Sequence, residues 1–256
     1  MSRKIFVYSL VIFCFILSGC SPSVNEQPPV QDNSDIKDFE SVTMNTPGVM
    51  EIYQGTNESL EISGDPAITS SIAAKVIDRI LTISSEIDLP TNSSITYKLF
   101  VKDLSSVVLN GSGVIKIPAY TSDNLELTIN GSSRMDLGDI KVSNLKFIIN
   151  DSGSIAADSV NSNSVSIISK NAGAVIIESG QTADLMVELG SGTFLGADFK
   201  STNANIDLIG SGSVQVWTVE KMDVTIDGSG NVTYFGEPTL SISINGGGQL
   251  TGGGNK

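Results

Sequence analysis

The sequence contains no histidine, and its two cysteines, Cys14 and Cys20, both lie at the N-terminal end. The lack of histidine excludes a Ser-His-Asp triad and a histidine-based metal site. Removal of residues 1–19 would leave Cys20 as the only thiol, which excludes a disulfide in the remaining chain. The common hydrolase and thiol routes are therefore closed, no cofactor is expected, and packing and backbone pairing must hold the fold together.

Basic residues are scarce, with 15 Lys and Arg against 28 Asp and Glu, for a formal charge of −13. Removal of residues 1–19 takes away Arg3 and Lys4 and no acid, so 15 − 2 = 13 basic residues remain and the charge becomes 13 − 28 = −15. So negative a surface repels phosphate backbones and anionic headgroups. We therefore expect no nucleic-acid partner, and membrane attachment only through a covalent lipid.

One long hydrophobic run is present, from Ile5 to Leu17, and it follows Arg3 and Lys4. Its roughly 13 residues are short for the ~20 that span a bilayer, which favours a cleaved signal over an uncleaved anchor. The residues Leu17-Ser18-Gly19-Cys20 resemble the bacterial lipobox, in which the cysteine is diacylated and becomes the mature N-terminus. We expect residues 1–19 to be a lipoprotein signal peptide and the product to be exported and lipid-anchored through Cys20 in the cell envelope.

The rest of the chain divides by composition into three parts. Residues 20–37 are rich in Ser, Pro, Asn and Gln and predict a lipidated, disordered tether. Residues 38–103 predict an N-terminal β module, with strands at Ser59–Ser63 and Ile80–Ser84. Within it, Asp65-Pro66 resembles a helix start, and Ile68, Ile72 and Val76 follow at a spacing of four, which predicts a turn or two of helix. Residues 104–256 contain repeats.

The repeats are marked by eight Gly-rich turns at intervals of 20, 20, 20, 19, 20, 18 and 18 residues, starting with Asn110-Gly111-Ser112-Gly113. The turns begin at Asn110, Asn130, Asn150, Lys170, Leu189, Ile209, Asp227 and Asn245. Their glycines are Gly111, Gly113, Gly131, Gly153, Gly173, Gly190, Gly192, Gly210, Gly212, Gly228, Gly230, Gly246 and Gly248. Glycine permits the sharp backbone turn that a corner between strands requires.

Apolar residues keep step with these turns. Three positions before each turn stand Val107, Leu127, Phe147, Ile167, Met186, Ile206, Val224 and Ile242. Five positions after the first turn residue stand Ile115, Met135, Ile155, Val175, Phe194, Val214, Val232 and Leu250. A third, weaker column includes Ile140, Val160, Phe199 and Val219. Ser169 and Glu188 occupy the position of Leu109, so we expect a register slip near the fourth and fifth repeats.

Repeats of 18 to 20 residues cannot bury an apolar face alone, whereas stacked coils can. The sequence therefore predicts an all-β fold: a single-stranded β-helix of about eight coils, with residues 38–103 capping one end. Asn110, Asn130 and Asn150 would then stack as an amide ladder. The alternative is a two-sheet sandwich or a barrel, which short strands and turns also suit but which does not require columns in register.

Two groups of side chains are candidates for function. Asp136, Asp139, Asp158, Glu178 and Asp198 follow the turns and could approach one another across coils, where paired carboxylates could cleave a glycosidic bond or hold calcium. The alternative, which the strand pattern favours, is that they are solvated charges on polar strand positions. Trp217, with Tyr234 and Phe235 one coil later, could form an exposed aromatic shelf for sugar rings or belong to the core.

Several segments together resemble the head GIN domain family, whose members are described as auto-transporter adhesins. They are Asp38-Phe39, Pro47-Gly48 with Val49-Met50-Glu51-Ile52, Gln54-Gly55, Leu60 to Asp65, and the Gly-Ser-Gly turns. The resemblance covers about Phe39 to the C-terminus. It implies a right-handed β-helix in a secreted or lipid-anchored bacterial envelope protein, with no catalytic residues to carry over.

Three functions follow from these patterns. The leading hypothesis is a non-enzymatic adhesin or binding module that presents a long polar face to glycans or surface proteins. The second is a carbohydrate-active enzyme, a polysaccharide lyase or glycosidase, that uses clustered carboxylates. The third is an envelope scaffold with weak end-to-end self-association, because solenoid ends expose strand edges.

Overall fold

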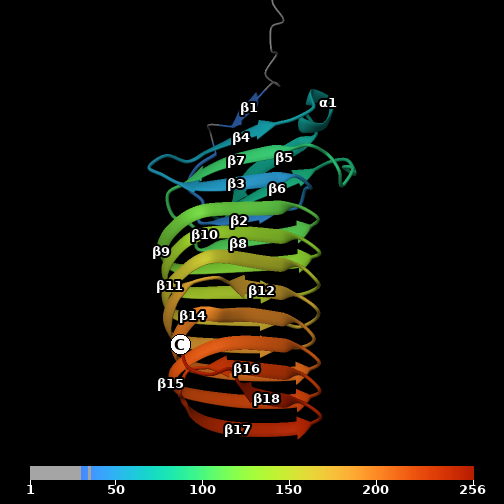
Figure 1. Cartoon of the computed structure of the whole chain (residues 1–256). Helices are drawn as coiled ribbons and strands as arrows, with labels where there is room; N and C mark the ends of the chain where they lie inside the picture. Colours follow the sequence, from blue (N-terminus) through green and yellow to red (C-terminus); the bar gives the residue numbers. More distant parts are fainter. Residues whose placement is uncertain (1–29, 34–35) are drawn as a thin grey trace, which may run out of the picture.

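The computed structural model describes residues 30–33 and 36–256, and its strands join into one stack of coils (Figure 1). The N-terminal elements are β1 (Val30–Asn33), β2 (Ser41–Met44), β3 (Val49–Gln54), β4 (Ser59–Ser63), α1 (Pro66–Thr69), β5 (Ile72–Ile77), β6 (Ile80–Ser85) and β7 (Thr96–Val101). The next elements are β8 (Ser106–Gly111), β9 (Val114–Gly131), β10 (Arg134–Ile149), β11 (Ser154–Ser169), β12 (Ala174–Ile177) and β13 (Gly180–Leu189). The last are β14 (Thr193–Gly210), β15 (Ser213–Gly228), β16 (Asn231–Phe235), β17 (Thr239–Gly246) and β18 (Gln249–Gly252).

Each coil pairs in parallel and in register with the coil before it. Leu127 of β9 pairs with Phe147 of β10, which in turn pairs with Ile167 of β11. This confirms the β-solenoid and excludes the sandwich, which has no such columns. The eight Gly-rich corners enclose about seven full coils rather than eight. In Figure 1 the corners lie at the right, and the chain curves continuously through a bend at the left.

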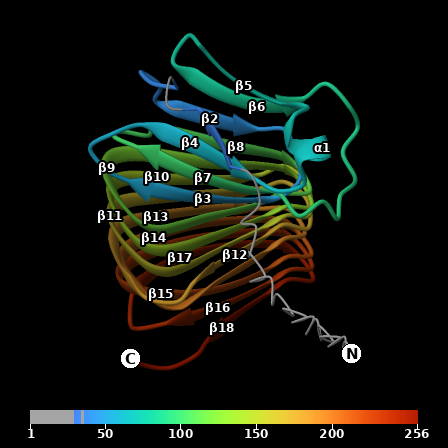
Figure 2. The same ribbon diagram turned by 90° about the horizontal axis from the view of Figure 1, so that it is seen from above.

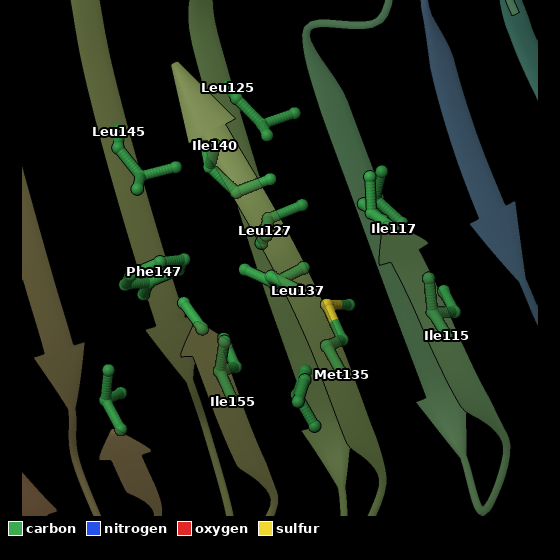
Figure 3. Close-up of a cluster of buried hydrophobic side chains, with 14 of the residues drawn as sticks. Ile115, Ile117, Leu125, Leu127, Met135, Leu137, Ile140, Leu145, Phe147 and Ile155 are labelled. Atoms are coloured by element: carbon green, nitrogen blue, oxygen red, sulfur yellow. The ribbon is translucent and has the colours of Figure 1, made fainter. Parts of the chain in front are cut away.

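The core is the inside of the coils, filled by alternate residues of each strand. Ile115, Met135 and Ile155 stack in one column, and Leu127 and Phe147 lie in another (Figure 3). All five are fully buried. Burial of apolar surface at about 25 cal/mol per Å² is the main term that offsets the entropy of ordering the coils.

Three members of the predicted columns are exposed instead of buried. Met186 is 41% exposed because Val187, one residue later, pairs with Ile167. Leu189 pairs with Ser169, the residue before the fourth corner, and the fifth corner has one residue fewer than the fourth. Counting three positions back from Leu189 therefore selects Met186, one residue before the inward-facing Val187. The expected register slip is confirmed, but the residue that faces inward beside Ser169 is Leu189 rather than Glu188.

The other two exceptions lie near the C-terminal end. Ile242 is 52% exposed because β17, in the last coil, pairs with β15 on one edge only within the described residues. Val219 is 40% exposed because it lies where the register of β15 on β14 shifts a second time, opposite the segment between Ser201 and Asn203. Just before it, β15 is three residues shorter than β14 at the bend, so Lys200 pairs with Trp217. Phe199 therefore has no counterpart in the following coil.

Corner glycines serve two different purposes. Gly131 has φ +121°, a left-handed conformation that side chains disfavour, and the carbonyl oxygen of Gly111 lies 2.8 Å from where a Cβ would be. Gly153 needs no such φ, but a Cβ there would lie 2.5 Å from Cγ2 of Ile129. The second glycine of the corner is thus required by close packing.

The predicted amide ladder is present at the corners, and it begins one coil earlier than expected. Asn110 donates from Nδ2 to Oδ1 of Asn45 at 2.6 Å. Asn130 donates to Asn110 at 2.8 Å, and Asn150 to Asn130 at 2.6 Å. Each amide thereby satisfies its neighbour, and the ladder extends from the N-terminal module into the coils.

The N-terminal strands continue the coil and then close its end (Figure 2). Met44 of β2 pairs with Leu109 of β8, and Met50 of β3 pairs with Ile115 of β9, both in parallel. Beyond them the pairing becomes antiparallel, because β4 pairs with β7 and β5 pairs with β6. Antiparallel strands end the parallel stack and cover the edge that it would otherwise expose.

The predicted helix is present as the single turn α1. The side chain of Asp65 caps it by accepting a hydrogen bond from the Ala67 amide at 2.9 Å. The spacing of Ile72 and Val76, however, does not indicate helix: both lie in β5. Ile72 is buried there, since β5 pairs with β6 and strand pairing overrides a short helical pattern.

Residues 20–37, where the sequence predicts a tether, include β1. Val30 pairs with Ser63 and Asn33 with Leu60, so β1 occupies the outer edge of β4. Residues 30–33 are thus paired, because β4 offers a row of backbone donors and acceptors. Cys20 and the predicted signal peptide lie outside the described residues. In the described part of the chain, no helix is long and apolar enough to cross a bilayer.

We expect Ser169→Ala to stabilise the fold. Ser169 is 1% exposed, and among the described residues its Oγ is the one buried side-chain polar atom without a hydrogen-bond partner. Removing an unpaired buried hydroxyl should raise the unfolding free energy by about 1 kcal/mol, measured by chemical denaturation. The outward-facing Ser166→Ala serves as the control, with a change within about 0.5 kcal/mol. A loss of stability on Ser169→Ala would contradict this account.

Alkaline pH should destabilise the fold through two buried tyrosines. Burial raises the pKa of Tyr97 to about 12 and that of Tyr120 to about 12, against opposing hydrogen bonds to Thr46 and Leu104. Unfolded tyrosine loses its proton near pH 10, so the unfolded state binds fewer protons between pH 10 and 12. The unfolding free energy should then fall by roughly 2 to 3 kcal/mol per tyrosine across that window.

Denaturation curves of the wild type and of Tyr97→Phe between pH 9 and pH 12 would measure this effect. The variant keeps the ring but has no proton to lose, so its stability should fall less steeply. Equal slopes for the two proteins would show that Tyr97 does not contribute.

Candidate functional site

One outward-facing residue from each of seven consecutive coils lines up along the bend. We call this set the bend column: it consists of Thr121, Lys141, Asn161, Gln181, Lys200, Trp217 and Phe235, each paired in register with the next. None of the seven is buried. Because the pairing is parallel, side chains from residues 121 to 235 of the sequence form one straight row.

The first four residues of the bend column line one shallow hollow of about 460 Å³. Thr121, Lys141, Asn161 and Gln181 share it with hydroxyl and amide groups of Ser122, Ser143, Ser162 and Asn163, and with Asp123. This part of the column is therefore rich in neutral hydrogen-bond donors and acceptors. Lys141 forms no ion pair within the described part of the chain.

The column continues into a second hollow of about 440 Å³, lined by Lys200, Trp217, Val219, Gly236, Glu237, Asn255 and Lys256. The Nζ of Lys200 lies 5.8 Å from the centre of the Trp217 ring. Gly236 leaves room for that ring, since a Cβ there would lie 3.3 Å from Cδ1 of Trp217 and 2.3 Å from the carbonyl oxygen of Thr218.

Phe235 follows Trp217 in the column and extends the aromatic surface by one coil. Lys256 Nζ lies 4.9 Å from the centre of its ring and also pairs with Asp198. The aromatic end of the column thus combines two ring surfaces with cations. This combination suits a ligand that has both apolar C–H faces and hydroxyl groups.

Tyr234 lies elsewhere than Trp217 and Phe235. It pairs with the buried Val216 and packs against the core, whereas Trp217 is partly exposed. The aromatic shelf expected from the sequence therefore consists of Trp217 and Phe235 and does not include Tyr234. Alternation along the strand explains the difference, since neighbouring residues face opposite sides.

Three of the five candidate carboxylates come together in a further hollow. Asp136, Asp158 and Glu178 line it with Lys116 and Arg134, and it has a volume of about 420 Å³. Arg134 Nε lies 2.5 Å from Oδ1 of Asp136 in an exposed ion pair. Asp139 and Asp198 are not among its lining residues. In the described part of the chain, no group of three acidic residues is placed to hold a metal ion.

The sequence pattern did not reveal most of the bend column. Lys141, Asn161, Gln181 and Lys200 are polar and vary in type, so no apolar periodicity marks them. A fixed number of residues after each corner does not identify the column either, because Trp217 follows its corner by fewer residues than Thr121 follows the first corner. The signal that could have found them is the fixed register of each strand on its predecessor.

Fold and site together define a β-solenoid with an exposed row of polar and aromatic side chains along one bend. Residues 38–238 match the family described as "Putative auto-transporter adhesin, head GIN domain", and the chain belongs to that family. No curated protein sequence matches the chain.

Solved structures share the fold. One is a "putative adhesin" from Parabacteroides merdae ATCC 43184, with 17% identity and a TM-score of 0.82; the match covers 89% of this chain and 97% of that one. Another, from Parabacteroides distasonis ATCC 8503, is described as a "putative lipid binding protein", with 22% identity and a TM-score of 0.80 over 89% and 97% of the two chains. At these identities the likeness concerns the fold alone.

Proposed function

We propose that this protein is an exported surface protein that binds glycans at the aromatic end of the bend column and releases them unchanged. The observation that carries the proposal is the hollow at Trp217, where an indole ring, lysine amines and the Glu237 and Asn255 side chains meet on one exposed surface. Aromatic rings pack against the C–H faces of sugars, while the polar groups bond their hydroxyls.

The family supports the same proposal. The family description and several similar structures use the word adhesin, which denotes binding to a surface. We further propose that residues 1–19 direct export and that a lipid on Cys20 anchors the product in the envelope. The support is the sequence Leu17-Ser18-Gly19-Cys20 after an apolar run.

A glycan array probed with the wild type and with Trp217→Ala would test the binding site. We expect the wild type to bind a subset of glycans and the variant to bind them at least about tenfold more weakly, a loss of ~1.4 kcal/mol. Tyr53→Ala is the matched control, because Tyr53 also lies beside another aromatic ring, that of Phe100, and has a lysine, Lys98, 5.9 Å from its ring centre.

The outcomes separate clearly. Unchanged binding by Tyr53→Ala with a loss in Trp217→Ala supports the site. A loss confined to Tyr53→Ala would move the site to the N-terminal module, and an array on which the folded wild type binds nothing would contradict glycan binding itself.

Hydrolysis or elimination of a glycan is the second candidate function, and the carboxylate hollow favours it. Asp158 and Glu178 lie on consecutive coils, since Ala157 pairs with Ile177, and both line that hollow. Its Lys116 and Arg134, together with the exposed ion pair of Asp136, are more typical of a solvated charge network.

We therefore expect no turnover. Incubating the wild type with the glycans that it binds should produce no new reducing ends and no unsaturated products. Asp158→Asn and Glu178→Gln should leave glycan affinity within about twofold of the wild type. Product formation that is abolished by either substitution would establish the enzymatic alternative.

A further inference from the structure

The two hollows on the bend column meet end to end. Gln181 lines the polar hollow and Lys200 lines the aromatic one, and these two residues are register partners on adjacent strands. No coil intervenes between them. The column therefore forms a continuous track from Thr121 to Phe235, parallel to the axis of the solenoid.

The track has a regular spacing that is set by the backbone. Adjacent strands of a sheet lie about 4.8 Å apart, so seven positions span roughly 29 Å. The spacing of about 4.8 Å between adjacent coils is close to the distance between successive rings of an extended, linear polysaccharide. A chain lying along the track would therefore present its rings in near register with the side chains, one ring at each coil.

Charge along the track is balanced. Three lysines, Lys141, Lys200 and Lys256, stand on it or beside it. Three acids accompany them: Asp123 and Glu237 line the hollows, and Asp198 pairs with Lys256. On a chain with a formal charge of −13, this gives a strip without excess charge of either sign. A neutral ligand fits such a strip better than an anionic one.

The chemistry also changes in one direction along the track. Coils from β9 to β13 offer hydroxyl, amide and amine groups, and those from β14 to β16 offer the two aromatic rings beside lysines. A polymer of one repeating sugar can satisfy both halves, because each ring carries both hydroxyls and an apolar face. A small ligand would use only one hollow.

We infer that a neutral, linear oligosaccharide binds lengthwise along the bend column, with about one sugar ring per coil. This inference rests on the proposed glycan-binding function and extends it to the shape and length of the ligand. Trp217 and Phe235 anchor one end by stacking, and Lys141, Asn161 and Gln181 bond the hydroxyls of the rings that follow.

Calorimetry with neutral xylo-, manno- and chito-oligosaccharides of about two to eight rings tests this arrangement, since seven positions correspond to about seven rings. In at least one series, affinity should rise with each added ring and level off near six or seven. The gain from three rings to six should be about tenfold or more.

Two variants locate the chain on the protein. The double variant Asn161→Ala/Gln181→Ala should remove the gain from added rings while leaving the affinity for three rings unchanged. Trp217→Ala should weaken binding at every length. Lys170→Ala, an exposed lysine at a corner, is the control and should change neither.

Each result decides between the proposals. Binding that depends on Trp217 but does not increase with length would overturn the lengthwise arrangement and leave the proposed function standing. Tighter binding to oligogalacturonates of equal length would overturn the preference for a neutral chain. If none of the oligosaccharides binds to the folded wild type, the lengthwise arrangement and the proposed function both fail for linear glycans, and an array with branched glycans then decides the proposed function alone.

Discussion

Parallel pairing of every coil with its predecessor is the constraint on which the rest of the structure depends. Once Leu127, Phe147 and Ile167 are in register, the remaining positions of those coils are in register too. Repetition in the sequence then becomes a column in space. Apolar columns fill the inside, asparagine amides bond one another at the corners, and a mixed polar and aromatic column follows the bend.

Changes in coil length are absorbed where they disturb this pairing least. The coil that ends at the fifth corner loses one residue within the corner, and pairing resumes with Ala174 opposite Thr193. The coil of β15 instead loses residues at the bend, where the register shifts between Gly196 and Lys200. The straight segments keep their partners in both cases. Corners and bends are therefore the places where this solenoid tolerates variation.

This division explains what could be predicted from the sequence. The corners carry glycine and the strands alternate, so the solenoid, its core columns and the amide ladder follow from counting. Counting failed for Met186 and Glu188 because one residue is lost at the fifth corner, and for Val219 because residues 197–199 have no partners in β15. Only strand pairing shows where these losses occur.

The same reasoning limits what the sequence shows of the site. Trp217 is conspicuous by its type, but its neighbours in space, Lys200 and Lys256, come from other coils and from the last residue of the chain. The carboxylates were grouped by their position after the turns, yet Asp198 lies beside Lys256 rather than with Asp158 and Glu178. Residue type suggested candidates, and register decided which of them meet.

Register also indicates why recognition would concentrate at the bend. At the corners, the side-chain amides of Asn110 and Asn130 hydrogen-bond to each other, which leaves few free donors and acceptors for a ligand. Along the straight segments, exposed charges such as Lys146 and Glu126 pair across adjacent coils in the same way. At the bend, long side chains including Lys141 and Lys200 stand beside hollows without an ion-pair partner in the described part of the chain. Side chains that form no ion pair within the fold are available to a ligand, and the parallel pairing at the bend arranges them in a row.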